Sequence, residues 1–262
     1  MSTHPTQAPG TTGDAHLDIV IPVYNEGENI VPVVRTLVRW VETPFRILLC
    51  YDFDEDNTLT ALREAGDLGA EIVYVKNTGR GAHGAVLSGF RASTGDAVLV
   101  FPADDVLNAR MLDAMYAQIR AGCDIVAASR FIPGGGMYNC PWLKDTLVRL
   151  AAWSLYHLAG VPTHDASNGF RMFSRRAIRE ISIESSEGFT YSLELLVKAH
   201  RRGWRVGEVP VVWVERSKGV SRFKVINWLP AYLRWFAYAF QTAANRRLHL
   251  PLPSDPRPGP RR

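Results

Sequence analysis

The sequence predicts an α/β protein with a mostly parallel, doubly wound sheet and helices on both of its faces. Short apolar runs typical of buried strands alternate with helix-length segments over residues 17–101, giving four strands with three helices between them. The fourth strand, residues 98–101, is wholly apolar and stops at Pro102, because proline cannot donate to a sheet ladder. This order predicts right-handed crossovers and a ligand site beyond the carboxyl ends of the strands.

The expected elements follow one another along the chain. The first strand covers residues 17–23, and the helix after it, residues 28–41, has apolar side chains at three- and four-residue spacing. Further strands are expected at residues 45–51, 71–76, 98–101, 124–129, 167–173 and 206–214. Further helices are expected at residues 58–65, 109–121, 142–158, 191–202 and 225–240, and one more runs from a glycine-rich turn at residues 79–84 to residue 92. Three consecutive glycines predict a mobile loop at residues 130–136.

Composition limits the class of protein. The chain has 262 residues, of which 47% are hydrophobic, enough to bury the core of one domain or of one domain with an appendage. A formal net charge of +4 is compatible with phosphorylated ligands or anionic membranes, but the basic residues form no stripe of the kind that binds nucleic acid. The three cysteines lack metal-ligand spacing, and their odd number argues against a disulfide scaffold, which fits a reducing cytosol.

The hydropathy of the chain predicts its location. Residues 1–16 contain no apolar core of a signal peptide, and no apolar run reaches the ~20 residues that span a bilayer. We therefore expect a cytoplasmic protein that binds peripherally to the cytoplasmic face of the membrane. The tails at residues 1–16 and 249–262 are expected to be disordered, since Pro is frequent in both.

Polar loops follow the first, second and fourth predicted strands, at residues 22–26, 52–56 and 103–105. Asp104 and Asp105 come directly after the fourth strand, where two carboxylates suit a divalent cation that also holds phosphate oxygens. A simple turn is the alternative, since Asp is common after strands. The Gly-x-Gly-x-x-Gly pattern of a dinucleotide-binding fold is absent from the first turn, and residues 79–84 imitate it only partly. The loops therefore favour a nucleotide ligand of another class.

An ordered set of motifs gives the chain a family resemblance. Residues 19–26 read IVIPVYNE, and further short motifs follow at residues 77–81, 95–96, 103–104, 129–131, 168–170, 208–210 and 219–223. The set resembles inverting GT-A glycosyltransferases of family 2, and within it the dolichyl- and polyprenyl-phosphate mannose or glucose synthases. The motifs span residues 17–224, which the resemblance implies to be the catalytic domain.

The resemblance implies roles for particular residues. The nucleotide-sugar pocket would be lined by Pro22, Tyr24, Glu26, Asp52, Arg80, Gly81, Ala103 and Asp104, with Asp52 near the base. Asp104 matches the second Asp of the Asp-x-Asp motif and would hold Mg²⁺ or Mn²⁺ against the donor pyrophosphate. Arg130 would grip phosphate, and Arg216, Lys218 and Arg222 would form a second basic cluster near the donor or lipid phosphate. Asp165 would orient the sugar or acceptor, unless it only caps a helix or stabilises a loop.

Two positions depart from the family pattern. Pro102 replaces the first Asp of the metal motif, and Val106 replaces the Gln that often follows it. Asp105 stands at a usually apolar position and could supply the missing carboxylate, which would make it a metal ligand and a catalytic residue beside Asp104, Asp165 and Arg130.

Several other residues have simpler interpretations. We expect His83 on the surface, His164 in a loop with phosphate binding as its alternative, and Trp204 and Trp213 in packing roles. Glu194 is expected either to contact the acceptor or to form an ion pair within its helix. The acidic run at residues 52–56 lacks the spaced glycine and terminal Glu of a calcium-binding EF-hand loop.

Residues 225–248 form an amphipathic segment rich in Trp, Tyr, Phe and Leu with basic residues at both ends. This composition suits a helix in the membrane interface, and a helix packed on the catalytic domain or at a dimer contact is the alternative. The sequence thus predicts a metal-assisted, inverting transfer of hexose from a GDP- or UDP-sugar to polyprenyl phosphate. A family-2 enzyme with a soluble saccharide acceptor and a non-catalytic nucleotide-sugar binding protein are the alternatives, and an oligomer stays open.

Overall fold

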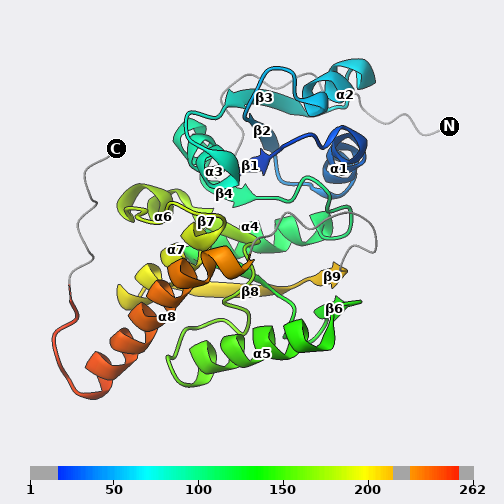
Figure 1. Ribbon diagram of the computed structural model, residues 1–262. Coiled ribbons are helices and arrows are strands. Elements are labelled where there is room, and N and C mark those ends of the chain that lie inside the picture. Colours follow the sequence, from blue (N-terminus) through cyan, green and yellow to red (C-terminus); the bar gives the residue numbers. More distant parts are fainter. Residues whose placement is uncertain (1–16, 215–224, 254–262) are drawn as a thin grey trace.

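The computed structural model describes residues 17–214 and 225–253. Within these residues the main sheet has seven strands in the order β3-β2-β1-β4-β7-β5-β8 (Figure 1). Their bounds are β1 Leu17–Pro22, β2 Phe45–Tyr51, β3 Glu71–Lys76, β4 Ala97–Val100, β5 Ile125–Ser129, β7 Arg171–Ser174 and β8 Val206–Pro210. All of them run parallel except β7, which lies antiparallel between β4 and β5. The predicted α/β class with a mostly parallel sheet is confirmed.

Side chains alternate along each central strand between two apolar layers. Leu17, Ile19 and Ile21 of β1 belong to one buried cluster, and Val20 belongs to the other. The first cluster lies under α1 Gly27–Trp40, α2 Asn57–Ala65 and α4 Leu112–Arg120, and the second under α3 Gly81–Ala92, α6 Arg175–Glu180 and α7 Thr190–Arg201. Helices therefore cover both faces of the sheet, as the wholly apolar strands require.

Gly89 allows α3 to approach the sheet closely. A Cβ atom at this position would lie 2.6 Å from Cγ1 of Val20 and 2.9 Å from Sγ of Cys50. Any larger residue would push the helix away from β1 and β2.

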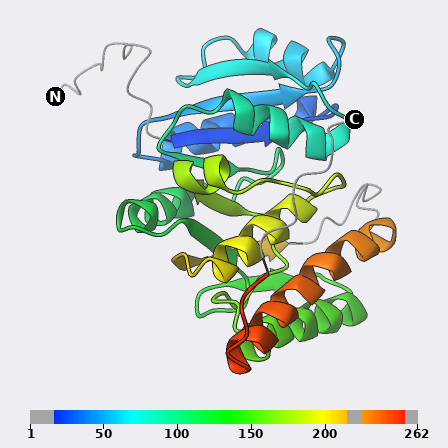
Figure 2. The ribbon, with the colours of Figure 1, turned by 90° about the vertical axis from the view of Figure 1, so that its left-hand side faces the viewer.

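Two further helices form a third layer at one end of the molecule (Figures 1 and 2). α5 Trp142–His157 and α8 Val225–Arg247 pack on α7 through a buried cluster that includes Leu155, Leu196 and Trp235. A small parallel sheet of β6 Gly136–Tyr138 and β9 Val212–Val214 lies next to them. In the described ranges no helix is long and apolar enough to cross a membrane.

The packing of α8 agrees with the alternative that the sequence left open for residues 225–248. Trp235 and Tyr238 are buried against α7, and only part of the helix, including Leu229 and Leu233, has exposed apolar side chains. Of the aromatic residues that suggested a membrane helix, Trp235 thus belongs to the core, and Tyr232, Phe236 and Phe240 pack against it. The side chain of Trp228 lies outside the described residues. Predictions for residues 1–16 and 254–262 lie outside the described residues.

Several predicted boundaries are wrong. The strand expected at residues 167–173 is β7, which begins only at Arg171 and is antiparallel. The single strand expected at residues 206–214 is divided into β8 and β9, which belong to different sheets. The loop expected at residues 130–136 ends in the first residue of β6, and α6 was not expected at all. Trp204 packs on the second cluster as predicted, but Trp213 is 38% exposed on β9.

A buried polar network stabilises the amino edge of the sheet. The carboxylate of Asp18 accepts hydrogen bonds from Arg46 Nε at 2.6 Å, Ser93 Oγ at 2.7 Å and the backbone N–H groups of Thr94 and Gly95 at 2.7 and 2.8 Å. Burial alone would raise the pKa of Asp18, but these hydrogen bonds, with that of Arg46 foremost, outweigh burial and hold the pKa below 3.8. The network thus joins the starts of β1, β2 and β4.

We expect Asp18→Asn to lower the free energy of unfolding by about 3 kcal/mol at pH 7, because the partly exposed guanidinium of Arg46 loses its counter-charge and the charge-assisted hydrogen bonds to a buried carboxylate are lost. The folded-state pKa of Asp18 is depressed, so its contribution is fully present above the unfolded pKa of about 3.9 and is lost as the pH falls through the folded value. Urea unfolding of both proteins between pH 7 and pH 2 measures this. The difference between them should shrink below about pH 4, and a difference that stays constant would contradict the assignment.

Candidate functional site

The carboxyl ends of the parallel strands place the predicted site residues at one edge of the sheet. Asp52 follows β2, Asp104 follows β4 and Arg130 follows β5. Because β7 runs the other way, the segment before it, with Asp165 and Asn168, lies at the same edge. Strand β1 is flanked by β2 on one side and β4 on the other, which is the topological switch point where open α/β sheets bind ligands.

The loop after β1 is held in place by the start of α2. The backbone N–H of Asn25 donates to Oδ2 of Asp56 at 3.0 Å, and that of Glu26 donates to Oγ1 of Thr58 at 2.9 Å. Asp56 also caps α2 by accepting from the backbone N–H of Thr58. The acidic run at residues 52–56 therefore has a structural function at its end, and it fixes the position of Tyr24 and Glu26.

Tyr24 and Phe53 bring two aromatic rings together at this edge. Their ring centroids lie 5.4 Å apart in an edge-to-face arrangement, and the side chain of Tyr24 is 49% exposed. An aromatic surface of this kind can pack against a nucleobase. Pro22 is the last residue of β1 and directly precedes the same loop.

Asn77 joins Asp52 to the glycine-rich turn. Its Nδ2 donates to Oδ1 of Asp52 at 2.6 Å and to the carbonyl oxygen of Gly81 at 3.2 Å, and its Oδ1 accepts from the backbone N–H of Gly79 at 2.8 Å. Gly81 has φ +58°, in the region that favours glycine. Asn77, which the prediction included only as a motif position, thus connects Asp52 and Gly81 of the predicted pocket, and Arg80 lies in the chain between the two glycines that Asn77 contacts.

The two carboxylates after β4 have different surroundings. The carboxylate of Asp105 accepts from the backbone N–H groups of Leu107 and Asn108 at 2.8 and 2.9 Å, and from Nδ2 of Asn108 at 2.7 Å. Asn108 in turn exchanges hydrogen bonds with the backbone of Val212 in β9. Asp105 therefore stabilises its own turn, as the simple interpretation of an Asp after a strand predicts, and its role as a metal ligand stays a prediction.

Asp104 is half-buried beside the buried Ala103. In the part of the chain that the structure describes, no three or more His, Cys, Asp or Glu side chains are grouped to hold a metal ion. A cation at Asp104 would therefore take most of its ligands from elsewhere, and donor phosphate oxygens are suitable because Mg²⁺ commonly combines one or two carboxylates with phosphates.

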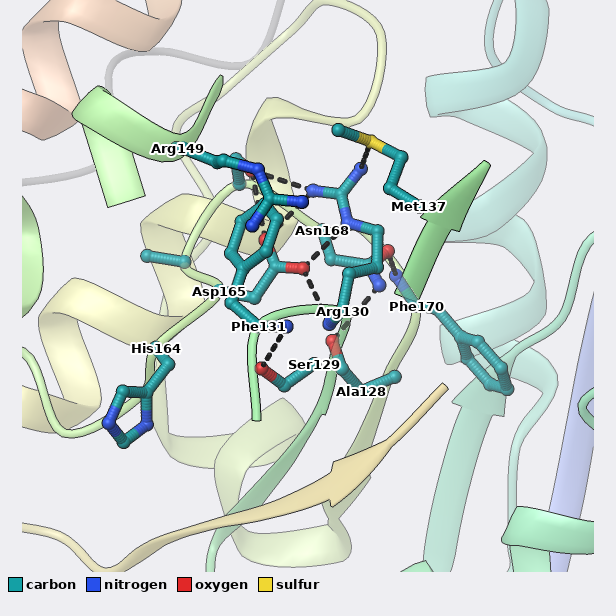
Figure 3. Close-up of polar contacts among 12 residues, drawn as sticks. Ala128, Ser129, Arg130, Phe131, Met137, Arg149, His164, Asp165, Asn168 and Phe170 are labelled. Carbon is teal, nitrogen blue, oxygen red and sulfur yellow. Dashed lines mark hydrogen bonds and ion pairs between the residues drawn. The ribbon is translucent and has the colours of Figure 1, made fainter. Parts of the chain in front are cut away.

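Arg130 and Asp165 form a bidentate ion pair (Figure 3). Nε of Arg130 lies 2.6 Å from Oδ2 of Asp165 and Nη2 lies 2.8 Å from Oδ1, while the backbone N–H of Arg130 also donates to Oδ2. Asp165 is fully buried and Arg130 is 11% exposed. Nη1 of Arg130 donates to the sulfur of Met137 at 3.5 Å, a weak acceptor that a phosphate oxygen could replace. Asp165 thus orients the guanidinium that was predicted to bind phosphate.

The segment before β7 is fixed by polar contacts that sequence reasoning missed. Nδ2 of Asn168 donates to the carbonyl oxygen of Ala128 at 2.9 Å, and the fully buried Arg171 donates to the carbonyl oxygens of Ala166 and Ser192. Burial lowers the pKa of Arg171 to about 10. The motif at residues 168–170 gave a signal for Asn168, but nothing in the sequence distinguishes Arg171 from a surface arginine.

His164 takes no part in the ion pair next to it. Its Nδ1 lies 2.8 Å from Oε2 of Glu208, its ring stacks on Tyr156 at 4.0 Å, and it points away from Arg130 (Figure 3). Glu194 forms a buried ion pair with Lys198 at 2.7 Å, which confirms the simpler of its two interpretations.

The prediction that His83 lies on the surface is wrong. Its side chain is 6% exposed, its Nδ1 lies 3.2 Å from the carbonyl oxygen of Gly188, and its ring contacts Tyr191. Helix α3, which contains His83 in its first turn, packs on the sheet, a tertiary effect that the local sequence does not encode. Arg216, Lys218 and Arg222 lie outside the described residues.

Residues 18–182 match the sequence profile of glycosyl transferase family 2. The chain belongs to this family. It is an enzyme, a glycosyltransferase with a GT-A fold, and the alternative of a non-catalytic binding protein finds no support among its relatives.

Among curated proteins, the polyprenol monophosphomannose synthase of Mycolicibacterium smegmatis is 31% identical over 227 residues, which cover 80% of this chain and 85% of that one. An uncharacterized glycosyltransferase of Mycobacterium bovis is 30% identical over 210 residues, covering 80% and 90% of the two chains. Both relatives thus match most of their own length.

Among solved structures, glucosyl-3-phosphoglycerate synthase of Mycobacterium tuberculosis superposes with a TM-score of 0.60 at 16% identity, covering 94% of this chain and 88% of that one. That crystal contains Mn²⁺, UDP and glucosyl-3-phosphoglycerate, and another crystal of the same enzyme, with a TM-score of 0.59, contains UDP-glucose. At this identity the likeness concerns the fold.

We expect Arg130→Lys to reduce turnover by about 100-fold, because lysine cannot keep a bidentate contact with Asp165 while it offers a donor to phosphate. Steady-state kinetics measure this. The control is Arg46→Lys, which alters the bidentate pair with Asp18 at the opposite edge of the sheet. That variant should lose stability and keep its turnover per folded molecule. Equal loss of turnover in both variants would show that Arg130 acts only through stability.

Proposed function

We propose that this glycosyltransferase transfers a hexose, mannose in the first place and glucose in the second, from a GDP- or UDP-sugar to polyprenyl phosphate with inversion of the anomeric carbon. The observation that carries the proposal is the 31% identity to polyprenol monophosphomannose synthase over 80% of the chain. The order of motifs from residues 19–26 to residues 208–210 supports it.

The chemistry of the acceptor fits the residues at the site. An ionised lipid phosphate is already a nucleophile, so the enzyme needs to align it behind the anomeric carbon and to stabilise charge on the departing nucleoside diphosphate. Arg130, which is oriented by its ion pair with Asp165, is suited to bind a phosphate at this edge. We assign Arg216, Lys218 and Arg222 to a second basic cluster, near the donor phosphate or the lipid phosphate.

The donor would bind across the switch point. We assign the base to the region of Tyr24, Phe53 and Asp52, and the pyrophosphate to the region between Arg80 and Asp104. The network through Asn77 would keep Asp52 and the glycine-rich turn in fixed relation while the donor enters. Donor specificity would then depend on the loops after β1 and β2.

Mg²⁺ or Mn²⁺ would be held by Asp104 together with donor phosphate oxygens. Such a cation neutralises the charge that develops on the leaving nucleoside diphosphate. The presence of Mn²⁺ with UDP in glucosyl-3-phosphoglycerate synthase, which shares the fold, supports this assignment. Because Asp105 accepts three hydrogen bonds from its own turn, we assign Asp104 rather than Asp105 as the principal ligand.

A soluble phosphorylated or saccharide acceptor is the second candidate. The structural likeness to glucosyl-3-phosphoglycerate synthase favours it, since that enzyme was crystallised with phosphoglyceric acid. Arg130 could bind the phosphate of such an acceptor as well as that of a lipid. The higher sequence identity to the polyprenol enzyme places this possibility second.

The test is the release of nucleoside diphosphate from GDP-mannose, GDP-glucose, UDP-glucose and UDP-galactose, with polyprenyl phosphate, with 3-phosphoglycerate or without acceptor. We expect release from one donor that depends on polyprenyl phosphate and stops in EDTA. Release that requires only 3-phosphoglycerate would instead establish the soluble acceptor.

Asp104→Asn should abolish the metal-dependent part of this activity, a loss of at least about 100-fold, because an amide is a much poorer ligand for a hard cation. Asp67→Asn provides the matched control, since Asp67 is an exposed residue of the loop between α2 and β3. Titration of Mn²⁺ against turnover in the three proteins measures the effect. Unchanged Mn²⁺ dependence in Asp104→Asn would exclude this residue as the ligand.

A further inference from the structure

α5 exposes an apolar face that no part of the described chain covers. This face, called the α5 face below, consists of Trp142, Leu143, Leu147, Leu150 and Trp153. Their exposed fractions range from 51% for Trp153 to 77% for Trp142. Large apolar side chains gathered on one stretch of surface indicate an interaction site. We propose that the α5 face binds the surface of an anionic lipid bilayer, an inference that rests on the proposed lipid acceptor.

The two faces of α5 have different partners. Ala152 and Leu155 are buried, and Leu155 packs in the cluster with α7 and α8. Leu143, Leu147, Leu150 and Trp153 recur at spacings of three and four, and Trp142 precedes Leu143, so the α5 face lies along the opposite side of the same helix. In the part of the chain that the structure describes, one side of α5 is therefore buried toward its carboxyl end, and the opposite side is exposed.

Charge on α5 fits a membrane with anionic headgroups. The α5 face contains no acidic residue, and basic Lys144 and Arg149 lie on the exposed part of the helix beside it. The one acidic residue of α5, Asp145, is paired with Arg149 at 2.8 Å. Tryptophan near both ends of an apolar stripe with cations beside it is the arrangement found at the headgroup boundary.

The length of α5 limits how it can meet lipid. Its 16 residues span about 24 Å, which is less than the ~30 Å of a hydrocarbon core. The carboxyl-terminal part of the helix is also packed on the protein, through Ala152 and Leu155. It would therefore lie in the plane of the interface, with its two Trp and three Leu side chains among the lipid headgroups.

The position of α5 connects this surface to the site. The guanidinium of Arg149 lies 4.7 Å from the ring centroid of Phe131, the residue after Arg130. α5 also begins four residues after the end of β6, at the edge where Arg130 lies. If a bilayer contacts α5, the phosphate of a polyprenyl phosphate could thus reach Arg130 while its prenyl chain remains in the bilayer.

α8 lies beside α5 (Figures 1 and 2) and could share this contact through Leu229, Leu233 and Arg234, which are all exposed. Its tryptophan at position 235 is buried, however. The structure therefore assigns the principal membrane contact to α5 and not to the segment at residues 225–248 that the sequence suggested.

The test is flotation of the full-length protein with vesicles of phosphatidylcholine, with and without 30 mol% phosphatidylglycerol. The variant Trp142→Ser/Leu147→Ser/Leu150→Ser/Trp153→Ser removes four exposed side chains, and Leu229→Ser/Leu233→Ser is the matched α8 control. We expect binding to the anionic vesicles to fall at least about 100-fold in the α5 variant. The α8 control should bind within a few-fold of wild type. Circular dichroism and thermal unfolding should be unchanged, because all these side chains are exposed.

Three results would overturn the inference. The α5 variant could bind vesicles as the wild type does, or wild type could fail to bind anionic vesicles. Light scattering could also show a wild-type dimer that the α5 variant dissociates, which would make the α5 face a contact with a second copy. Failure of the proposed function looks different: wild type would bind vesicles through α5 and still release no nucleoside diphosphate with polyprenyl phosphate.

A second readout links the surface to turnover. With a short, water-soluble prenyl phosphate the α5 variant should be as active as wild type, whereas with long-chain polyprenyl phosphate in vesicles it should be at least 10-fold less active. Equal losses on both acceptors would mean that the substitutions disturb the catalytic domain, which would contradict the assignment of this face to membrane binding.

Discussion

The parallel pairing of β1 with β2 and β4 is the constraint on which the rest of the structure depends. It brings the loops after these strands to one edge of the sheet, and it leaves a switch point between the loops after β2 and β4. The two edges have different functions. At the amino edge, Asp18 and Arg46 make hydrogen bonds to each other and to neighbouring groups within the protein. At the carboxyl edge, several polar and aromatic groups face outward.

The antiparallel strand β7 extends this site. Because β7 runs against its neighbours, the segment that precedes it begins at the carboxyl edge and brings Asp165 to Arg130. A fully parallel sheet would place that segment at the opposite edge. The buried Arg171 and Asn168 then hold the segment to α7 and β5, which gives the guanidinium of Arg130 a rigid support.

Local patterns in the sequence were sufficient for much of this architecture. Wholly apolar runs such as residues 98–101 predicted the buried parallel strands, and polar loops at their ends predicted where the site lies. The motifs also indicated Arg130 and Asp165, but not that they pair, because their contact joins residues 35 apart in the sequence. The direction of β7, the division of residues 206–214 and the burial of His83 depend on tertiary packing and could not be predicted locally.

The same limit explains why the sequence suggested α8 as the membrane-binding helix, whereas the structure led us to propose α5. Both sequences are amphipathic and rich in Trp and Leu, so hydropathy alone could not tell which helix packs on α7 and which faces outward. The structure buries Trp235 and exposes Trp142. An enzyme with this arrangement would contact lipid through one helix and bind its donor at an edge of the sheet that is joined to that helix by the contact of Arg149 with Phe131.

The proposed transfer is tested most directly by following the sugar itself. The protein is incubated with a donor labelled in the hexose, polyprenyl phosphate and Mg²⁺, and the products are separated into organic and aqueous phases. We expect label in the organic phase as a hexosyl phosphoryl polyprenol of inverted anomeric configuration, at a level that depends on added polyprenyl phosphate. Label that stays in the aqueous phase, on a soluble phosphorylated acceptor or as free hexose, would contradict the proposed transfer.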